Sequence, residues 1–119
     1  ITITTAIVSL LSGRMVHPEL AMTHWNLARC LRKLDRPAEA AAQRRRCWKL
    51  ECADDGPAEP GTLQSAVAVV RDLLAAQQPD AAQQVIDTAL QTVEDAEAEN
   101  PAREKWVLKL AELAASITG

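Results

Sequence analysis

The stretch His17–Ala40, HPELAMTHWNLARCLRKLDRPAEA, contains two prolines that open successive helical patterns. They belong to a series of five prolines separated by 19, 23, 19 and 22 residues: Pro18, Pro37, Pro60, Pro79 and Pro101. Proline fixes φ near the helical value and has no N–H to lose in the first turn, so regularly spaced prolines indicate successive helix starts. Two helices in each unit of about 42 residues predict an all-α fold, an α-solenoid of antiparallel helix pairs.

Apolar residues at helical spacing predict about six helices in this register. The expected helices cover 3–11, 18–34, 37–53, 61–77, 79–93 and 101–119, with a turn at Asp35 and Arg36 and the longest loop over Asp54–Gly61. In the second helix, the expected buried stripe is His24, Leu27, Ala28, Leu31 and Leu34. We therefore expect one domain, 1–119: 1–16 end a preceding unit, 17–58 form unit 1, 59–99 form unit 2, and 100–119 are the first helix of unit 3 or a cap.

The composition agrees with a single helical domain. The chain has 119 residues, is 48% hydrophobic, and contains three Trp but neither Phe nor Tyr, which favours close helix packing over strands. Because the first residue is Ile and no signal peptide is visible, we expect a segment of a longer protein. No apolar run reaches the roughly 18 residues of a membrane span, and a cytoplasmic location is expected.

Neither the cysteines nor the histidines form a pattern typical of chemistry. Cys30, Cys47 and Cys52 are odd in number and lack a C-x-x-C pair, which favours reduced thiols, and we expect Cys30 and Cys47 to be buried packing residues. The spacings of these cysteines, His17 and His24 match no zinc pattern. The sequence has no Gly-rich phosphate loop and no recognisable triad, so we expect no catalytic residues, no metal, no cofactor and no enzyme activity.

The first unit resembles a tetratricopeptide repeat. The resemblance is carried by His17 to Ala28 (HPELAMTHWNLA), by Leu31 and Leu34, and by Asp35 to Ala40 (DRPAEA). It is closest to the long repeat of about 42 residues in kinesin light chains and many bacterial proteins, whose units open with His-Pro-Asp and continue with Asn-Leu-Ala. The segments from Glu59 and from Asn100 are similar but degenerate copies. The resemblance implies a right-handed superhelix whose first helices line a concave, peptide-binding face.

On this resemblance, the binding residues lie on the exposed face of the first helix in each pair. In each first helix, candidate binding residues spaced three and four apart lie together on that face, and in the first unit they lie away from Leu27 and Leu31. The resemblance implies that Asn26 contacts a peptide backbone, and the cations suit the carboxylates of an acidic or C-terminal peptide. Three other interpretations of these residues are equally open. They belong to the repeat's usual sequence pattern, they pack against a neighbouring helix, or they form a solvated surface. The expected peptide-binding residues are Met22, Trp25, Asn26, Arg29, Arg32, Lys33, Gln64, Arg71, Lys105 and Lys109.

Charge is distributed unevenly along the chain. Residues 1–50 hold nine Lys or Arg against three Asp or Glu, and residues 51–119 hold four against thirteen, giving balances of about +6 and −9. The basic half, with Arg44, Arg45 and Arg46, suits an anionic partner, but nucleic acid is disfavoured because no aromatics interleave with the arginines. Head-to-tail self-association and neutralisation within the fold are the other interpretations.

The leading hypothesis is therefore a non-catalytic scaffold that binds a protein or peptide, within a larger bacterial regulatory protein. The rival hypothesis is a structural spacer or self-association segment of such a protein. A binding module is expected to lose its partner when Asn26 and Arg29 are both changed to Ala with helicity intact.

Overall fold

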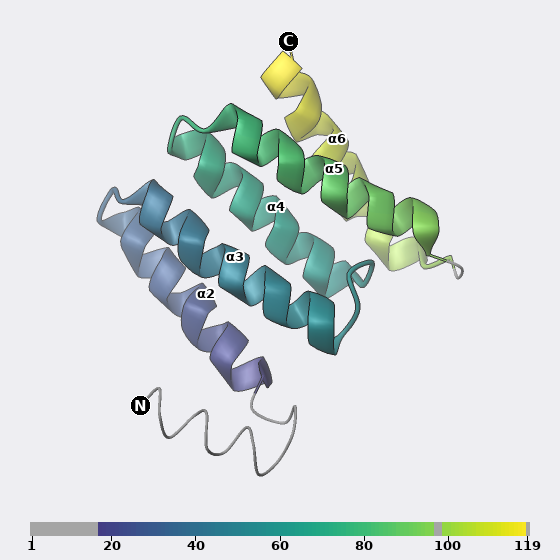
Figure 1. Ribbon diagram of the computed structural model, residues 1–119, viewed down its shortest axis with the longest axis horizontal. Helices are drawn as coiled ribbons and strands as arrows, with labels where there is room; N and C mark the ends of the chain where they lie inside the picture. The colour runs from purple at the N-terminus through teal and green to yellow at the C-terminus, as the bar shows by residue number, and fades with distance from the viewer. Residues whose placement is uncertain (1–16, 97–98, 119) are drawn as a thin grey trace.

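The computed structural model describes residues 17–96 and 99–118 and contains, within them, five α-helices and one short 3-10 helix. Helices that follow one another in sequence pack as antiparallel neighbours (Figure 1). The elements are α2 (His17–Lys33), α3 (Pro37–Asp54), α4 (Pro60–Ala75), α5 (Pro79–Asp95), η2 (Pro101–Arg103) and α6 (Glu104–Thr118). The all-α prediction is confirmed; the helix expected over 3–11 lies outside the described residues.

The prolines mark the helix starts as the sequence predicts. Pro37, Pro60 and Pro79 are the first residues of α3, α4 and α5, and α2 begins one residue before Pro18. Pro101 instead begins η2, where the Asn100 side chain accepts a hydrogen bond from the Ala102 N–H at 3.0 Å. Each proline occupies a first turn, where a missing N–H costs no helical hydrogen bond.

The loop between α3 and α4 is shorter than expected, because both helices extend into it. It covers residues 55–59, and Gly56 has φ of +108°, which favours glycine. The Gly56 N–H and the Asp55 N–H both donate hydrogen bonds to the Glu51 carbonyl, with N–O distances of 3.1 and 2.8 Å. This reversal fixes the end of α3, and with it Glu51 and Asp55, beside the start of α4.

The helices form two layers. The molecule measures 47 × 39 × 19 Å, and its short dimension matches two helix diameters of about 10 Å each. In Figure 1, α3 and α5 lie nearer the viewer, and α2, α4 and α6 lie behind them. The first helix of each pair thus belongs to one layer and the second helix to the other.

The main hydrophobic core is centred on α4, which packs against α3, α5 and α6. Leu63, Val70, Ile86 and Leu110 are fully buried there, and burial of such a side chain contributes about 1.5–3 kcal/mol. A smaller cluster of Ala28, Leu31 and Ala40 joins α2 to α3. The alanines allow these two helices to approach closely.

The expected buried stripe on α2 is wrong at two positions, and the burial of Cys30 is also wrong. Leu27 is 44% exposed, Leu34 is 65% exposed, and Cys30 is exposed. These three residues share a helical face that the partner helix α3 does not cover. Burial needs a neighbour on each apolar side, and in the described part of the chain α2 packs chiefly against α3.

Candidate functional site

Two adjoining hollows lie on the layer formed by α2, α4 and α6. The first, called here the acidic hollow, has a volume of about 380 Å³ and contains the carboxylates of Glu51 and Asp55. The second, called here the basic hollow, has a volume of about 220 Å³. Trp25 and Gln64 line both. The remaining lining residues are Ala21, Met22, Cys47, Gly61 and Ser65 in the acidic hollow, and Arg32, Arg44, Val67, Ala68, Arg71, Asp72 and Trp106 in the basic hollow.

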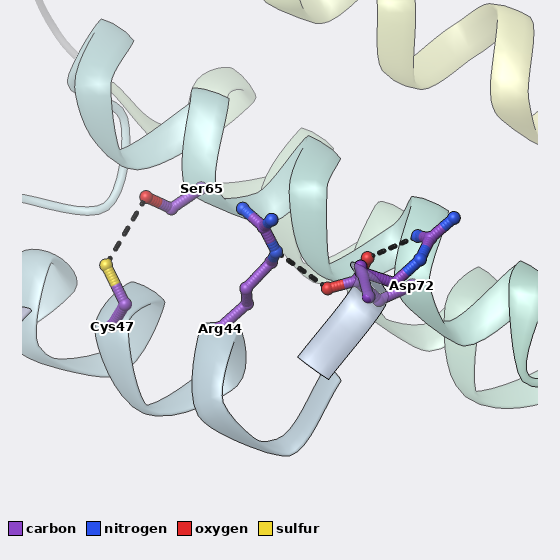
Figure 2. Close-up of polar contacts among 5 residues, drawn as sticks. Arg44, Cys47, Ser65 and Asp72 are labelled. Atoms are coloured by element: carbon purple, nitrogen blue, oxygen red, sulfur yellow. Dashed lines mark hydrogen bonds and ion pairs between the residues drawn. The ribbon is translucent and has the colours of Figure 1, made fainter. Parts of the chain in front are cut away.

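A small polar cluster lies at the junction of α3 and α4, in the wall of the acidic hollow. Ser65 Oγ donates to Glu51 Oε1 at 2.5 Å, and Cys47 Sγ donates to the same oxygen at 2.8 Å. Figure 2 shows the Cys47 and Ser65 side chains pointing toward one another from the two helices, with Sγ and Oγ 3.8 Å apart. One oxygen of Glu51 therefore satisfies two buried donors.

This environment keeps the Cys47 thiol protonated. Burial, followed by the hydrogen bond and the negative charge of Glu51, raises the pKa of Cys47 to about 12. Burial and the same charge raise the pKa of Cys52. Because the thiolate is the nucleophilic form of cysteine, Cys47 is an unreactive packing residue, as the sequence predicts.

The basic hollow is organised by a buried carboxylate. Asp72 on α4 is 2% exposed, and its Oδ1 accepts a hydrogen bond from Arg32 Nη1 on α2 at 2.6 Å. Its Oδ2 lies 2.7 Å from Arg44 Nε on α3, with the N–H turned off the line between the atoms, so this contact is an ion pair without a well-directed hydrogen bond. One acid thus connects three helices.

The guanidinium of Arg44 is left with donors that point away from the acid. Arg44 is 9% exposed, and its Cζ lies 4.3 Å from the centroid of the Trp25 ring, a cation–π contact. Figure 2 shows its terminal nitrogens on the side away from Asp72. Neither of them donates a hydrogen bond to the described part of the chain. A buried cation with unused donors therefore lines the basic hollow.

The structure brings half of the predicted binding residues to these hollows. Met22, Trp25 and Gln64 line the acidic hollow, and Trp25, Arg32, Gln64 and Arg71 line the basic one. Arg32 is engaged there by Asp72. The predicted residues that line neither hollow are Asn26, Arg29, Lys33, Lys105 and Lys109.

Two of these remaining residues have contacts within α6. Lys105 Nζ lies 4.7 Å from the centroid of the Trp106 ring, and Lys109 Nζ lies 3.3 Å from Glu112 Oε2. Asn26, Arg29 and Lys33 are exposed on α2.

Sequence reasoning missed Asp72 and Glu51, and placed Arg44 only among cations available to an anionic partner. A signal for Asp72 was present: together with Arg71 it separates the apolar pairs Val69–Val70 and Leu73–Leu74, and it occupies the register position of Cys30 in the first unit. An acid inside an apolar run is seldom buried without a cation. Arg44, at a register position where the next unit has Ile86, is a matching signal for a buried charge.

No three His, Cys, Asp or Glu side chains among residues 20–96 and 99–118 are grouped as metal ligands would be. None of the described helices has both the length and the hydrophobicity needed to cross a bilayer.

Comparison of the chain with protein-family models, with curated proteins and with solved structures found no match in any of the three.

Proposed function

We propose that this chain is a non-catalytic helical repeat module of the tetratricopeptide type that binds a peptide or protein segment on its α2–α4–α6 face. In this proposal the five helices are a section of a right-handed α-solenoid, and the hollows lie on its concave side. The repeated helix pairs and the resemblance of unit 1 support the class. The ligand contact is proposed to be a carboxylate seated in the basic hollow.

The observation that carries the proposal is the buried Arg44 guanidinium with unused donors. Guanidinium groups bind carboxylates through paired N–H groups, and such charge-assisted hydrogen bonds strengthen where water is excluded. Arg71 adds a second cation at the rim of the same hollow. Asp72 balances one of the three arginines, so the hollow keeps a positive charge for an acidic side chain or a chain end.

The test compares two arginines at matching repeat positions. Arg71 lines the basic hollow, whereas Arg29, which occupies the same register position 42 residues earlier, does not. Both are exposed, so replacement with glutamine preserves the fold. The probe is an acetylated Gly-Ser-Gly-Glu peptide with a free end, and the control peptide has Gln and an amidated end. Calorimetric titration gives both affinities.

We expect Arg71→Gln to weaken binding of the acidic peptide about fivefold, the upper range for an exposed pair. Arg29 lines neither hollow, so, in contrast to the expectation from helical spacing alone, we expect Arg29→Gln to leave binding unchanged. Binding is also expected to weaken as salt is raised, because screening reduces attraction between partly exposed charges. Equal binding of the two peptides, or equal effects of the two substitutions, would exclude the basic hollow as a carboxylate site.

Self-association is the second candidate, and the exposed apolar residues of the first and last described helices favour it. Leu27 and Leu34 are exposed on α2, and Leu108 is exposed on α6. Stacked repeats bury such faces against a neighbouring pair. Sedimentation at increasing protein concentration distinguishes the two: self-association requires a mass that rises with concentration and falls for Leu34→Glu.

A further inference from the structure

We infer that the acidic hollow takes the basic side chain, arginine or lysine, of the same bound segment. This inference rests on the proposed peptide-binding function and specifies its ligand: a segment that carries both an acidic and a basic group. The two hollows share Trp25 and Gln64, so neighbouring groups of one peptide fit into both.

Unpaired carboxylates are the first support. Glu51 uses Oε1 for Ser65 and Cys47, and within the described residues no cation lies at ion-pair distance from either of its oxygens. Asp55, exposed at the mouth of the hollow, likewise has no cation there. By contrast, Asp72 in the next hollow has two arginines. The acidic hollow therefore holds two carboxylates that have no ion-pair partner among the described residues.

The negative charge of the hollow also acts on its neighbours. After burial, the charge of Glu51 contributes to raising the pKa of both Cys47 and Cys52, and at Cys47 it outweighs the opposite contribution of the Arg44 charge. A field that disfavours a thiolate favours a cation at the same place. Among the described residues that line this hollow there is no Lys or Arg, so the described lining itself supplies no cation.

The walls fit a side chain with a long apolar stem. Met22 is an exposed, flexible apolar residue at the rim, and Trp25 provides an aromatic ring. Arg and Lys pack their methylene stems on apolar surface and favour the vicinity of indole rings. This chain already uses that contact twice, with Arg44 at Trp25 and Lys105 at Trp106.

The same walls disfavour a metal ion. No three His, Cys, Asp or Glu side chains among the described residues are grouped as metal ligands would be, and one oxygen of Glu51 is already engaged by Ser65 and Cys47. The volume of about 380 Å³ lies within the usual range of about 300–1,000 Å³ for pockets that hold organic ligands. An organic cation fits both the shape and the charge.

The test titrates the protein with N-acetyl-arginine methylamide and, as the neutral isostere, N-acetyl-citrulline methylamide. NMR monitors the Met22 methyl group and the Trp25 indole N–H. We expect saturable shifts with the arginine probe and binding at least about tenfold weaker with citrulline, because the charge-assisted hydrogen bonds are lost.

Variants locate the contact. Glu51→Gln combined with Asp55→Asn is expected to weaken arginine binding about tenfold, since both carboxylates face the cation. Asp55→Asn alone keeps the Ser65 and Cys47 contacts of Glu51. It is expected to weaken arginine binding less than the double variant does. Glu94→Gln removes one exposed charge from α5, outside both hollows, and is expected to have no effect.

The outcomes separate this inference from the proposed function. Equal binding of arginine and citrulline probes, or insensitivity to the Glu51 and Asp55 changes, overturns the cation site even if the acidic peptide still binds at Arg71. Shifts of Met22 and Trp25 that grow with protein concentration and without probe would assign the hollow to another copy of the chain, and would overturn it as well.

Discussion

Asp35 and Gln77, 42 residues apart, end α2 and α4 with the same left-handed backbone conformation, φ of 58° and 62°. In each case the N–H of the next residue donates a hydrogen bond to the carbonyl five residues earlier. Arg36 donates to Leu31 and Gln78 donates to Leu73, both at 2.9 Å. This is the Schellman arrangement, which satisfies helix-end carbonyls. Pro37 and Pro79 then begin the next helices. The two helix pairs therefore turn through one backbone geometry.

Gln77→Gly is expected to stabilise the protein. A side chain at positive φ costs about 1–2 kcal/mol, part of which glycine loses again through a freer unfolded chain, so the net gain is up to about 1 kcal/mol. Asp35→Gly is expected to gain less, because Asp tolerates this conformation. Urea denaturation measures both. Ala42→Gly, at an exposed position inside α3, is the control and is expected to destabilise by about 0.5–1 kcal/mol.

Asp72→Ala is expected to destabilise the protein by about 3–5 kcal/mol. The substitution leaves the buried Arg44 cation without its acid, and a charge orphaned in this way costs far more than the pair gains. Urea denaturation gives the free energy of unfolding. Asp87→Ala, which removes an exposed acid on α5, is the matched control and is expected to change it by no more than about 0.5 kcal/mol.

Arg44→Ile combined with Asp72→Ala tests the cause of that loss. Isoleucine is the residue that α5 has at the matching position, Ile86, and an apolar replacement removes the orphaned charge. We expect the double variant to be more stable than Asp72→Ala alone, and to have lost its affinity for the acidic peptide. A double variant as unstable as the single one would trace the loss to something other than Arg44.

Alkaline pH is expected to destabilise the protein through Cys47. Burial and the contact with Glu51 raise the pKa of Cys47 from 9.0 to about 12 in the folded state. The folded state therefore holds this proton more tightly than the unfolded chain does. The resulting stability is fully present below pH 9 and is lost progressively as the pH rises toward 12.

Thermal denaturation between pH 8 and 11 measures this contribution as the difference between variants. Cys47→Ala, which gives α3 the residue of the matching position Ala89, is expected to lose stability less steeply with pH than the wild type. Cys30→Ala, at an exposed thiol, is expected to follow the wild type. Parallel curves for all three proteins would contradict the assignment to Cys47.

The prolines made the helix order predictable, because each carries its own backbone restriction. Pro37, Pro60 and Pro79 begin helices whatever packs around them. Burial was less predictable. Cys30 and Asp72 occupy the same register position, yet the first is exposed and the second buried, because α4 is surrounded by α3, α5 and α6. Register assigns a face to a residue, and the neighbouring helices decide whether that face is covered.

The candidate site was predictable only where it uses exposed faces of the first helices. Met22, Trp25 and Gln64 were found through helical spacing and the repeat resemblance. Arg44 and Glu51 come from α3, the second helix of a pair, and reach the hollows through the gap between α2 and α4. The residue pattern of one helix does not show whether its side chains extend past a neighbouring helix, because that depends on the spacing between α2 and α4.

The contact between Arg44 and Asp72 gives the units a fixed order. In a chain with residues 17–58 duplicated, the first copy of Arg44 would face the second copy of Cys30, which occupies the place of Asp72. A guanidinium would then be enclosed beside a thiol, at a cost of about 3–5 kcal/mol. A version of this chain extended by copying residues 17–58 is therefore destabilised at that junction, and a stable longer array requires an acid at the copied position of Cys30.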